Sequence, residues 1–180
     1  LRAAHGHPAP FGLRYLEIGN ENGMFGSFGG TLQQYSERYE AFRAAIAAKW
    51  PDVLPIANTR VKHPMQIVDD HFYMSSGWFW AEADRYAKAD RKGPKIYIGE
   101  YAVTHDPGVT GNLRAALGEA AFLFGCERNS DLVTMTSYAP LFVHVKDRKW
   151  NPDAIQFDGL RSCGTPSFRS EEHTSELHSR

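Results

Sequence analysis

The sequence predicts an α/β protein built on a parallel sheet, and three observations support this class. Short apolar segments that can be buried on both faces recur along the chain, bounded by turn residues. Segments with helical periodicity lie between them. With 42% hydrophobic and 13% aromatic residues, a chain of 180 residues can bury a real core. Because strands and helices alternate, we expect parallel pairing through right-handed crossovers.

The first predicted strand covers about 13–21 and ends in an amide and a carboxylate, Asn20 and Glu21. A glycine-rich loop follows, and Thr31 is a typical cap for the helix that comes next. Apolar and aromatic residues recur along that helix in one stripe, which we interpret as the face packed on the sheet: Leu32, Tyr35, Tyr39, Phe42 and Ile46. Pro51 ends the helix.

Four more strands are predicted, at 53–58, 66–73, 95–101 and 132–138. A helical pattern near 80–90 separates the third from the fourth. A second one, from 111 to about 126, separates the fourth from the fifth. We expect it to face inward with one set of apolar residues: Leu113, Leu117, Ala120, Ala121 and Phe124. Five strands and three helices are too few to close an eight-stranded barrel.

The C-terminal part of the chain carries weaker signals. Residues 141–168 contain turn chemistry at 150–153 and 164–166 and no clear period. The last twelve residues, 169–180, are polar, lack a core period and match the translation of a common sequencing adapter. We expect this tail to be artefactual or disordered.

The charge and composition of the chain limit the classes of partner and site that the sequence suits. Twenty basic and 21 acidic side chains give a net charge of −1, which argues against nucleic acid and suits a neutral substrate. No apolar run is long enough to span a membrane, and no signal segment is visible, although the chain begins at Leu1. The two cysteines, Cys126 and Cys163, have neither metal-ligand nor CxxC spacing.

Two glutamates at predicted strand ends suggest chemistry, because barrel enzymes hold their catalytic groups at the C-terminal ends of the strands. Glu21 and Glu100 could provide the two carboxyl groups, about 5 Å apart, that a retaining glycoside hydrolase needs. Asn20 could bind a sugar hydroxyl beside Glu21, which suits an acid/base. Tyr73 could orient an ionised Glu100, which suits a nucleophile.

The residues alone leave other interpretations open. Glu17 has the same side-chain parity as Glu21, and either glutamate at a strand end could be a solvated loop residue. His71 could be an ordinary packed histidine and Asp69-Asp70 an exposed pair. A metal site of His71, Asp70 and a glutamate lacks HxxxH or HxH spacing. A GxSxG elbow is absent, and the loop at 26–30 lacks the lysine of a phosphate-binding loop.

Six blocks occur in order between about residues 13 and 168: YLEIGNEN at 15–22, GPKIYIGEYAV at 93–103, GNLRAALGEAAFLFGCERNSD at 111–131, SYAPLFV at 137–143, WNPDAI at 150–155 and GTPS at 164–167. Together they resemble the α-L-arabinofuranosidases of glycoside hydrolase family 51. The resemblance implies a (β/α)8 TIM barrel with a separate β-sandwich domain. Residues 1–168 would be the C-terminal part of that catalytic barrel, roughly strands 4 to 8.

The resemblance also implies site residues. Glu21 matches the family's general acid/base, Glu100 its nucleophile and Asn20 the Asn before the acid/base. His71 and Tyr73 resemble its substrate-side His and nucleophile-supporting Tyr. No cofactor or metal is expected, because two carboxylates suffice. Since early strands would be missing, we expect the chain by itself to fold poorly and hydrolyse little.

The implied activity is retaining release of terminal α-L-arabinofuranosyl residues from arabinoxylan or arabinan. The alternatives are another retaining hydrolase of the same barrel clan, of xylanase or glucanase type, and a non-catalytic carbohydrate-binding fragment. An extracellular or periplasmic location is favoured over the cytoplasm. The sequence leaves the linkage preference and the oligomeric state open.

Overall fold

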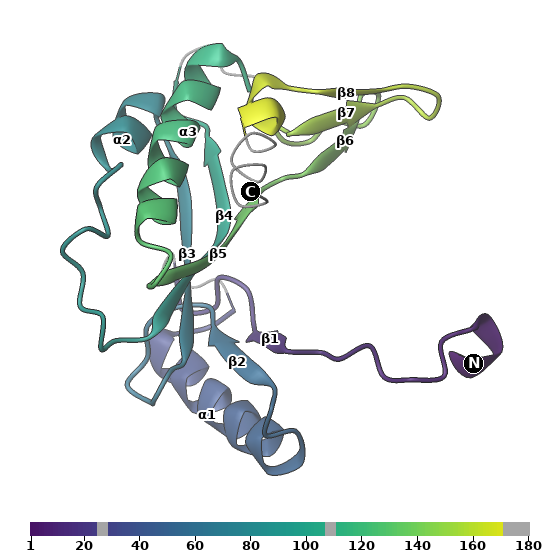
Figure 1. Cartoon of the computed structure of the whole chain (residues 1–180), viewed down its shortest axis with the longest axis vertical. Coiled ribbons are helices and arrows are strands. Elements are labelled where there is room, and N and C mark those ends of the chain that lie inside the picture. The colour runs from purple at the N-terminus through teal and green to yellow at the C-terminus, as the bar shows by residue number, and fades with distance from the viewer. Residues whose placement is uncertain (25–28, 107–110, 171–180) are drawn as a thin grey trace. The chain divides into compact units, whose positions relative to one another are not determined.

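The computed structural model describes residues 1–24, 29–106 and 111–170, and it divides into two compact units, Leu1–Asp69 and Asp70–Arg180 (Figure 1). Strand β3 (Ile67–Met74) begins in the first unit and continues into the second. Each unit is described by itself below. Of the predicted tail, 169–180, the structure describes Arg169 and Ser170, which lie in a helical turn at 166–170, and the rest lies outside the described residues.

The first unit contains a short 3₁₀ turn, η1 (Ala3–His5), strands β1 (Tyr15–Ile18) and β2 (Leu54–Ala57), and helix α1 (Leu32–Lys49). β1 pairs with β2, and β2 pairs with the start of β3, both in parallel as predicted. The predicted cap is confirmed: Thr31 Oγ1 accepts the Gln34 amide at 3.2 Å, and the Gln34 side chain accepts the Thr31 amide at 2.9 Å.

The core of the first unit joins one face of α1 to the strands. Tyr35, Tyr39 and Ile46 are buried with Ile18 and Ala57, which confirms that part of the predicted stripe. The stripe was wrong for Leu32 and Phe42, which remain exposed. The two strands beside the helix have four residues each, so they cover only part of its 18-residue length.

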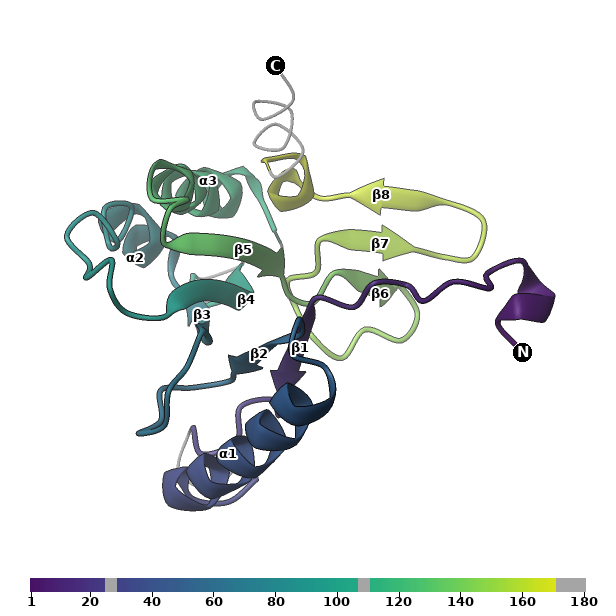
Figure 2. The ribbon, with the colours of Figure 1, turned by 60° about the horizontal axis from the view of Figure 1, so that its bottom comes forward.

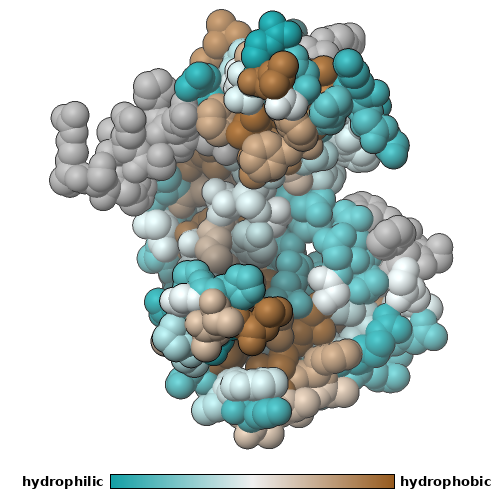
Figure 3. Space-filling view, turned by 90° about the vertical axis from the view of Figure 1, so that its right-hand side faces the viewer, coloured by the Kyte–Doolittle hydropathy of each residue, from teal (hydrophilic) through white to brown (hydrophobic). Residues whose placement is uncertain are grey.

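A hollow of about 690 Å³ lies beside β1 in the first unit. Its walls are largely apolar, and the hydrophobic surface in the lower half of Figure 3 belongs to this unit. The apolar side chains that line the hollow include Phe11, Leu13, Leu16, Ile46 and Trp50. Apart from Ile46, these side chains are exposed, and an exposed apolar patch of this kind is typical of a surface that contacts protein, ligand or membrane.

The second unit contains the rest of β3, helix α2 (Ser76–Ala81), strand β4 (Lys95–Val103), helix α3 (Leu113–Arg128) and strand β5 (Val133–Tyr138). β4 lies between β3 and β5 and pairs with β5 in parallel. The helix expected near 80–90 is wrong in position. It begins earlier because Ser75 caps it, its hydroxyl accepting the Trp78 amide at 3.1 Å.

Helix α3 packs on α2 through small residues, so the predicted inward face was wrong. Leu113, Leu117 and Phe124 are exposed, whereas Gly118 and Gly125 are buried. A Cβ at Gly118 would lie 2.8 Å from the Ser76 carbonyl oxygen, and one at Gly125 would overlap the Ala83 carbonyl. Gly118 lets α3 approach α2 closely, and Gly125 lets it approach the segment just after α2, so these close contacts select the face that is buried.

Three short strands follow where the sequence showed no period: β6 (Phe142–His144), β7 (Ile155–Phe157) and β8 (Ser162–Gly164). They form a separate sheet in which β7 pairs in parallel with β6 and antiparallel with β8 (Figure 2). Strands of three residues are too short to show a periodicity.

The parallel pairs and the intervening helices agree with the predicted α/β class and fit part of an α/β barrel. In the part of the chain that the structure describes, none of the helices has the length and apolar character needed to cross a membrane.

Candidate active site

The turn that carries Asn20 and Glu21 follows β1 in the first unit. The predicted strand, 13–21, was too long, because β1 ends at Ile18 and Gly19 turns the chain with a φ of 87°. Glu21 has a φ of 54°, which is uncommon for a residue with a side chain and is found most often in turns and at functional sites. Its carbonyl accepts the Met24 amide at 3.1 Å. Asn20 is exposed and Glu21 is half-buried.

Tyr35 of α1 connects the end of β1, where this turn starts, to the end of β2. Its buried hydroxyl donates to the Ile18 carbonyl and accepts the Asn58 amide, both at 2.8 Å. Burial raises the pKa of the Tyr35 hydroxyl, so it keeps its proton at any ordinary pH. The last residue of β1 and the first residue after β2 are thus fixed to the same side chain.

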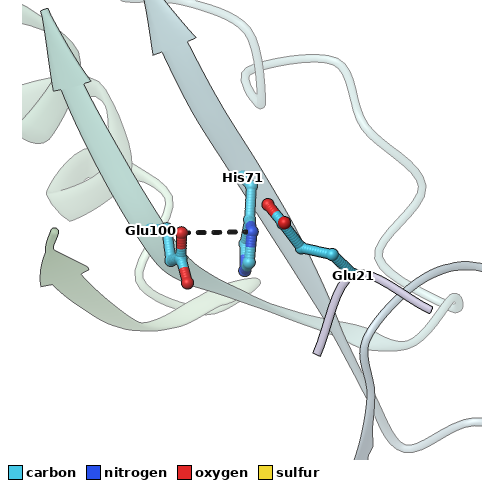
Figure 4. A group of neighbouring side chains, drawn as sticks. All are labelled: Glu21, His71 and Glu100. Atoms are coloured by element: carbon cyan, nitrogen blue, oxygen red, sulfur yellow. Dashed lines mark ion pairs between the residues drawn. The ribbon is translucent and has the colours of Figure 1, made fainter. Parts of the chain in front are cut away.

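Glu100, His71 and Tyr73 come together in the second unit, from the neighbouring strands β4 and β3. The Tyr73 hydroxyl donates to Glu100 Oε2 at 2.5 Å, which is the contact that the sequence predicted. His71 Nδ1 lies 3.6 Å from the same oxygen (Figure 4). The His71 side chain is 1% exposed, whereas 27% of the Glu100 side chain is exposed. The carboxylate is therefore held from one side and open on another.

The strand alternation of β3 explains which residues face Glu100. Phe72 packs on Trp78 and Phe122, so it points toward the helices. His71 and Tyr73 point to the opposite face. Asp70 has the parity of Phe72, and its Oδ2 accepts the Tyr86 hydroxyl at 3.4 Å. The alternative metal site with Asp70 and His71 as joint ligands is thus disfavoured, because the two side chains leave the strand on opposite faces.

A bulge in β4 directs Glu100. Ile98 pairs with Thr136 and Tyr101 with Tyr138, so β4 advances three residues while β5 advances two. In a regular strand Glu100 would share the face of Ile98, which is fully buried. The extra residue breaks the alternation and lets the carboxylate reach Tyr73. Bulges commonly re-aim a side chain in this way next to active sites.

Two hydroxyl contacts hold the backbone just before Glu100. Ser137 Oγ donates to the Gly99 carbonyl at 2.6 Å and lies 2.8 Å from the Tyr97 hydroxyl. Ser137 belongs to β5, so the backbone preceding the bulge is fixed to the neighbouring strand.

Trp150 completes the surroundings of Tyr73. The two rings meet edge to face, with centroids 5.4 Å apart. Sequence reasoning quoted Trp150 only as part of a block and did not consider Tyr35 beyond the packed stripe. The position of Trp150 beside Asn-Pro in a polar loop could have indicated a role. Nothing in the sequence indicates the two hydrogen bonds of the Tyr35 hydroxyl.

This arrangement can support displacement chemistry at Glu100. A carboxylate that accepts a hydrogen bond from a phenol and remains partly open is oriented and accessible to an electrophilic carbon. The predicted roles of Glu21 and Asn20 remain predictions, and the same holds for the separation of the two glutamates.

Comparisons with known proteins place the chain in a family. Residues 1–91 match the family model described as alpha-L-arabinofuranosidase 1 domain, and residues 99–180 match the alpha-L-arabinofuranosidase C-terminal domain. Alpha-L-arabinofuranosidase 2 of Arabidopsis thaliana is 43% identical over 173 residues, which cover 93% of this chain and 25% of that protein. The extracellular exo-alpha-L-arabinofuranosidase of Streptomyces chartreusis is 34% identical over 96% of this chain and 21% of its own length.

Comparisons with solved structures support the same family. An arabinose-bound MgGH51 α-L-arabinofuranosidase superposes with a TM-score of 0.85 at 34% identity, covering 96% of this chain and 29% of that chain. The α-L-arabinofuranosidase of Thermotoga maritima gives a TM-score of 0.69 at 18% identity, which supports the fold alone. The chain spans about a quarter of the length of the curated relatives it matches. By sequence and by structure, the chain belongs to the α-L-arabinofuranosidases of glycoside hydrolase family 51.

Proposed function

We propose that the protein to which this chain belongs is a retaining glycoside hydrolase that releases terminal α-L-arabinofuranosyl residues from arabinose-containing hemicellulose or pectin. One observation carries the proposal: Glu100 is partly open, while Tyr73 and His71 approach one oxygen of its carboxylate. The family membership supports the sugar, because the curated relatives are named arabinofuranosidases and a solved relative is arabinose-bound.

In the first step Glu100 attacks the anomeric carbon and the glycosidic bond breaks. Glu21 gives its proton to the leaving oxygen, and the sugar is left as an ester of Glu100. In the second step Glu21 takes a proton from water, the resulting oxygen nucleophile attacks the anomeric carbon, and the ester breaks to restore the Glu100 carboxylate. Two inversions give net retention at the anomeric carbon.

The neighbouring residues have supporting roles in this mechanism. Tyr73 fixes the rotamer of Glu100 and stabilises its charge before attack. His71 is the proposed substrate-side histidine, and because its side chain is nearly fully buried beside the same carboxylate, it would help to position Glu100 against the bound sugar. Asn20 is exposed next to Glu21 and would hydrogen-bond a sugar hydroxyl.

We also propose that β1 to β5 are barrel strands four to eight. The parallel pairs support this assignment, as does the apolar hollow beside β1, a surface that a further barrel element would cover. The extracellular relative from Streptomyces chartreusis supports an extracellular location, which cell fractionation with an antibody would test.

The test uses the protein expressed from its complete reading frame. Glu100→Gln should abolish turnover of every α-L-arabinofuranoside. Glu21→Gln should lose about 10²- to 10⁴-fold on substrates with poor leaving groups. It should retain ester formation on activated aryl substrates and be rescued by azide, with retained configuration. Glu37→Gln is the matched control, because Glu37 is exposed on α1 and its carboxylate accepts a hydrogen bond from the neighbouring Gln33 side chain at 2.7 Å.

Three outcomes would redirect the proposal. Azide rescue of Glu17→Gln instead of Glu21→Gln would move the acid/base role to Glu17. Faster turnover of aryl xylosides or glucosides than of the arabinofuranoside would favour the rival hydrolase of the same clan. Sugar binding without turnover, unchanged by Glu100→Ala, would indicate a non-catalytic binding protein.

A further inference from the structure

Trp150 is a large aromatic side chain that stays open beside the candidate nucleophile. It is 47% exposed, although its ring packs against Tyr73 at 5.4 Å with an interplanar angle of 60°. Tyr73 in turn donates to Glu100. A chain of two contacts therefore links the partly exposed indole to the partly exposed carboxylate.

The loop that presents Trp150 is held in place by its own polar contacts. Arg148 lies 3.8 Å from the carboxylate of Asp153, whose side chain is almost fully buried. The Arg148 guanidinium also donates to Asn151 Oδ1 at 3.4 Å. The Ala154 amide donates to the Pro140 carbonyl at 3.1 Å. The indole is thus positioned before any ligand arrives, which lowers the entropic cost of binding.

We propose that Trp150 is a carbohydrate-binding platform that contacts a neutral sugar ring of the substrate held at Glu100. Sugars present C–H groups on their ring faces, and the negative face of an aromatic ring attracts such positively polarised edges. Ligand sites are commonly lined by aromatic side chains with a few polar groups that fix orientation. Here Trp150 is the aromatic wall, and Tyr73, His71 and Glu100 are the polar groups.

This inference rests on the proposed function, because it places a sugar beside Glu100. It adds a contact that the double-displacement mechanism does not require. A tryptophan that only supported Tyr73 would contribute to the orientation of Glu100 and not to saccharide affinity. The two roles therefore differ in what they predict for KM and kcat.

The test combines binding and kinetics in the protein expressed from its complete reading frame. In the Glu100→Gln background, arabinose and an arabino-oligosaccharide should change the tryptophan fluorescence, and most of the change should disappear with Trp150→Phe. In the otherwise unchanged enzyme, Trp150→Ala should raise KM by about 2- to 12-fold, with Trp150→Phe recovering part of the loss. Trp80→Ala is the matched control, because Trp80 is also an exposed tryptophan, at 61%, and belongs to α2.

Three results would overturn the platform: an unchanged saccharide-induced fluorescence signal in Trp150→Phe, a fall in kcat at constant KM in Trp150→Ala, or equal effects of Trp150→Ala and Trp80→Ala. Failure of the proposed function is distinguishable. If Glu100→Ala leaves turnover unchanged but the saccharide signal still depends on Trp150, the hydrolase mechanism is wrong and the platform stands.

Discussion

Replacing Tyr35 with Phe removes one hydroxyl and leaves the ring that fills the core. The side chain is 2% exposed, and its hydroxyl bonds both the Ile18 carbonyl and the Asn58 amide at 2.8 Å. A buried backbone group that loses its partner costs about 1–3 kcal/mol. For two such groups we expect the free energy of unfolding to fall by roughly 2–5 kcal/mol. Because the Tyr35 hydroxyl keeps its proton in both the folded and the unfolded chain at any pH well below the ordinary tyrosine pKa, this loss should not vary with pH in the neutral range.

Tyr39→Phe is the matched control on the same helix. Tyr39 is fully buried, and its hydroxyl has no hydrogen-bond partner among the residues that the structure describes. Removing that hydroxyl should leave stability unchanged or raise it slightly. Urea unfolding of both variants gives the comparison directly, because the two substitutions remove the same atom from neighbouring turns of α1.

Tyr35→Phe should also change the kinetics of the enzyme. Ile18 is three residues before Glu21, so a loosened strand end should misplace the proposed proton donor. We expect Tyr35→Phe to lose kcat/KM on arabinofuranosides with poor leaving groups and to keep it on a 2,4-dinitrophenyl substrate, which needs little protonation. Equal unfolding free energies for Tyr35→Phe and Tyr39→Phe would refute the stability argument. If folded Tyr35→Phe loses kcat/KM equally on both kinds of substrate, the argument that the proton donor is misplaced is refuted.

Further tests concern the second unit. Tyr73→Phe removes a charge-assisted bond to Glu100, so kcat should fall by about 10- to 150-fold while circular dichroism stays unchanged; an unaltered kcat would remove Tyr73 from the site. Gly125→Ala places a Cβ on the Ala83 carbonyl and should lower the free energy of unfolding by about 3 kcal/mol, measured in urea. Burial raises the pKa of Glu119, so the unfolded chain releases that proton at lower pH than the folded one. Stability should therefore fall as pH rises between the two pKa values, and Glu119→Gln should flatten this slope in pH-dependent melts.

Strand positions and the polar residues at strand ends were predictable because they are local in the sequence. His71 and Tyr73 are two residues apart in the predicted strand, so their shared face follows from the two-residue repeat of a strand once the strand is recognised. The cap at Thr31 was equally readable, because a capping box needs only four residues. In both cases all the residues that take part lie within one short segment of the sequence.

The buried face of α3 could not be predicted from hydrophobicity. Leu113 and Leu117 are the stronger apolar residues, but Gly118 and Gly125 permit the close approach of α2. That choice depends on the surface of the other helix, which no window within α3 contains. The short β1 has a similar origin, because the φ of Gly19 and not the apolar pattern decides where the strand ends.

The bulge at Gly99-Glu100 has a consequence for how such a strand can change. Deleting Gly99 would restore a regular pleat in which Glu100 follows Ile98 directly and still leaves the strand on the face opposite to Ile98, while Tyr101 would keep the side of Ile98. A deletion at this point of β4 therefore preserves the faces of the core residues that follow, whereas a deletion in the regular part of a strand exchanges its two faces. The bulge is thus a place where the length of the strand can change by one residue without turning its core residues outward.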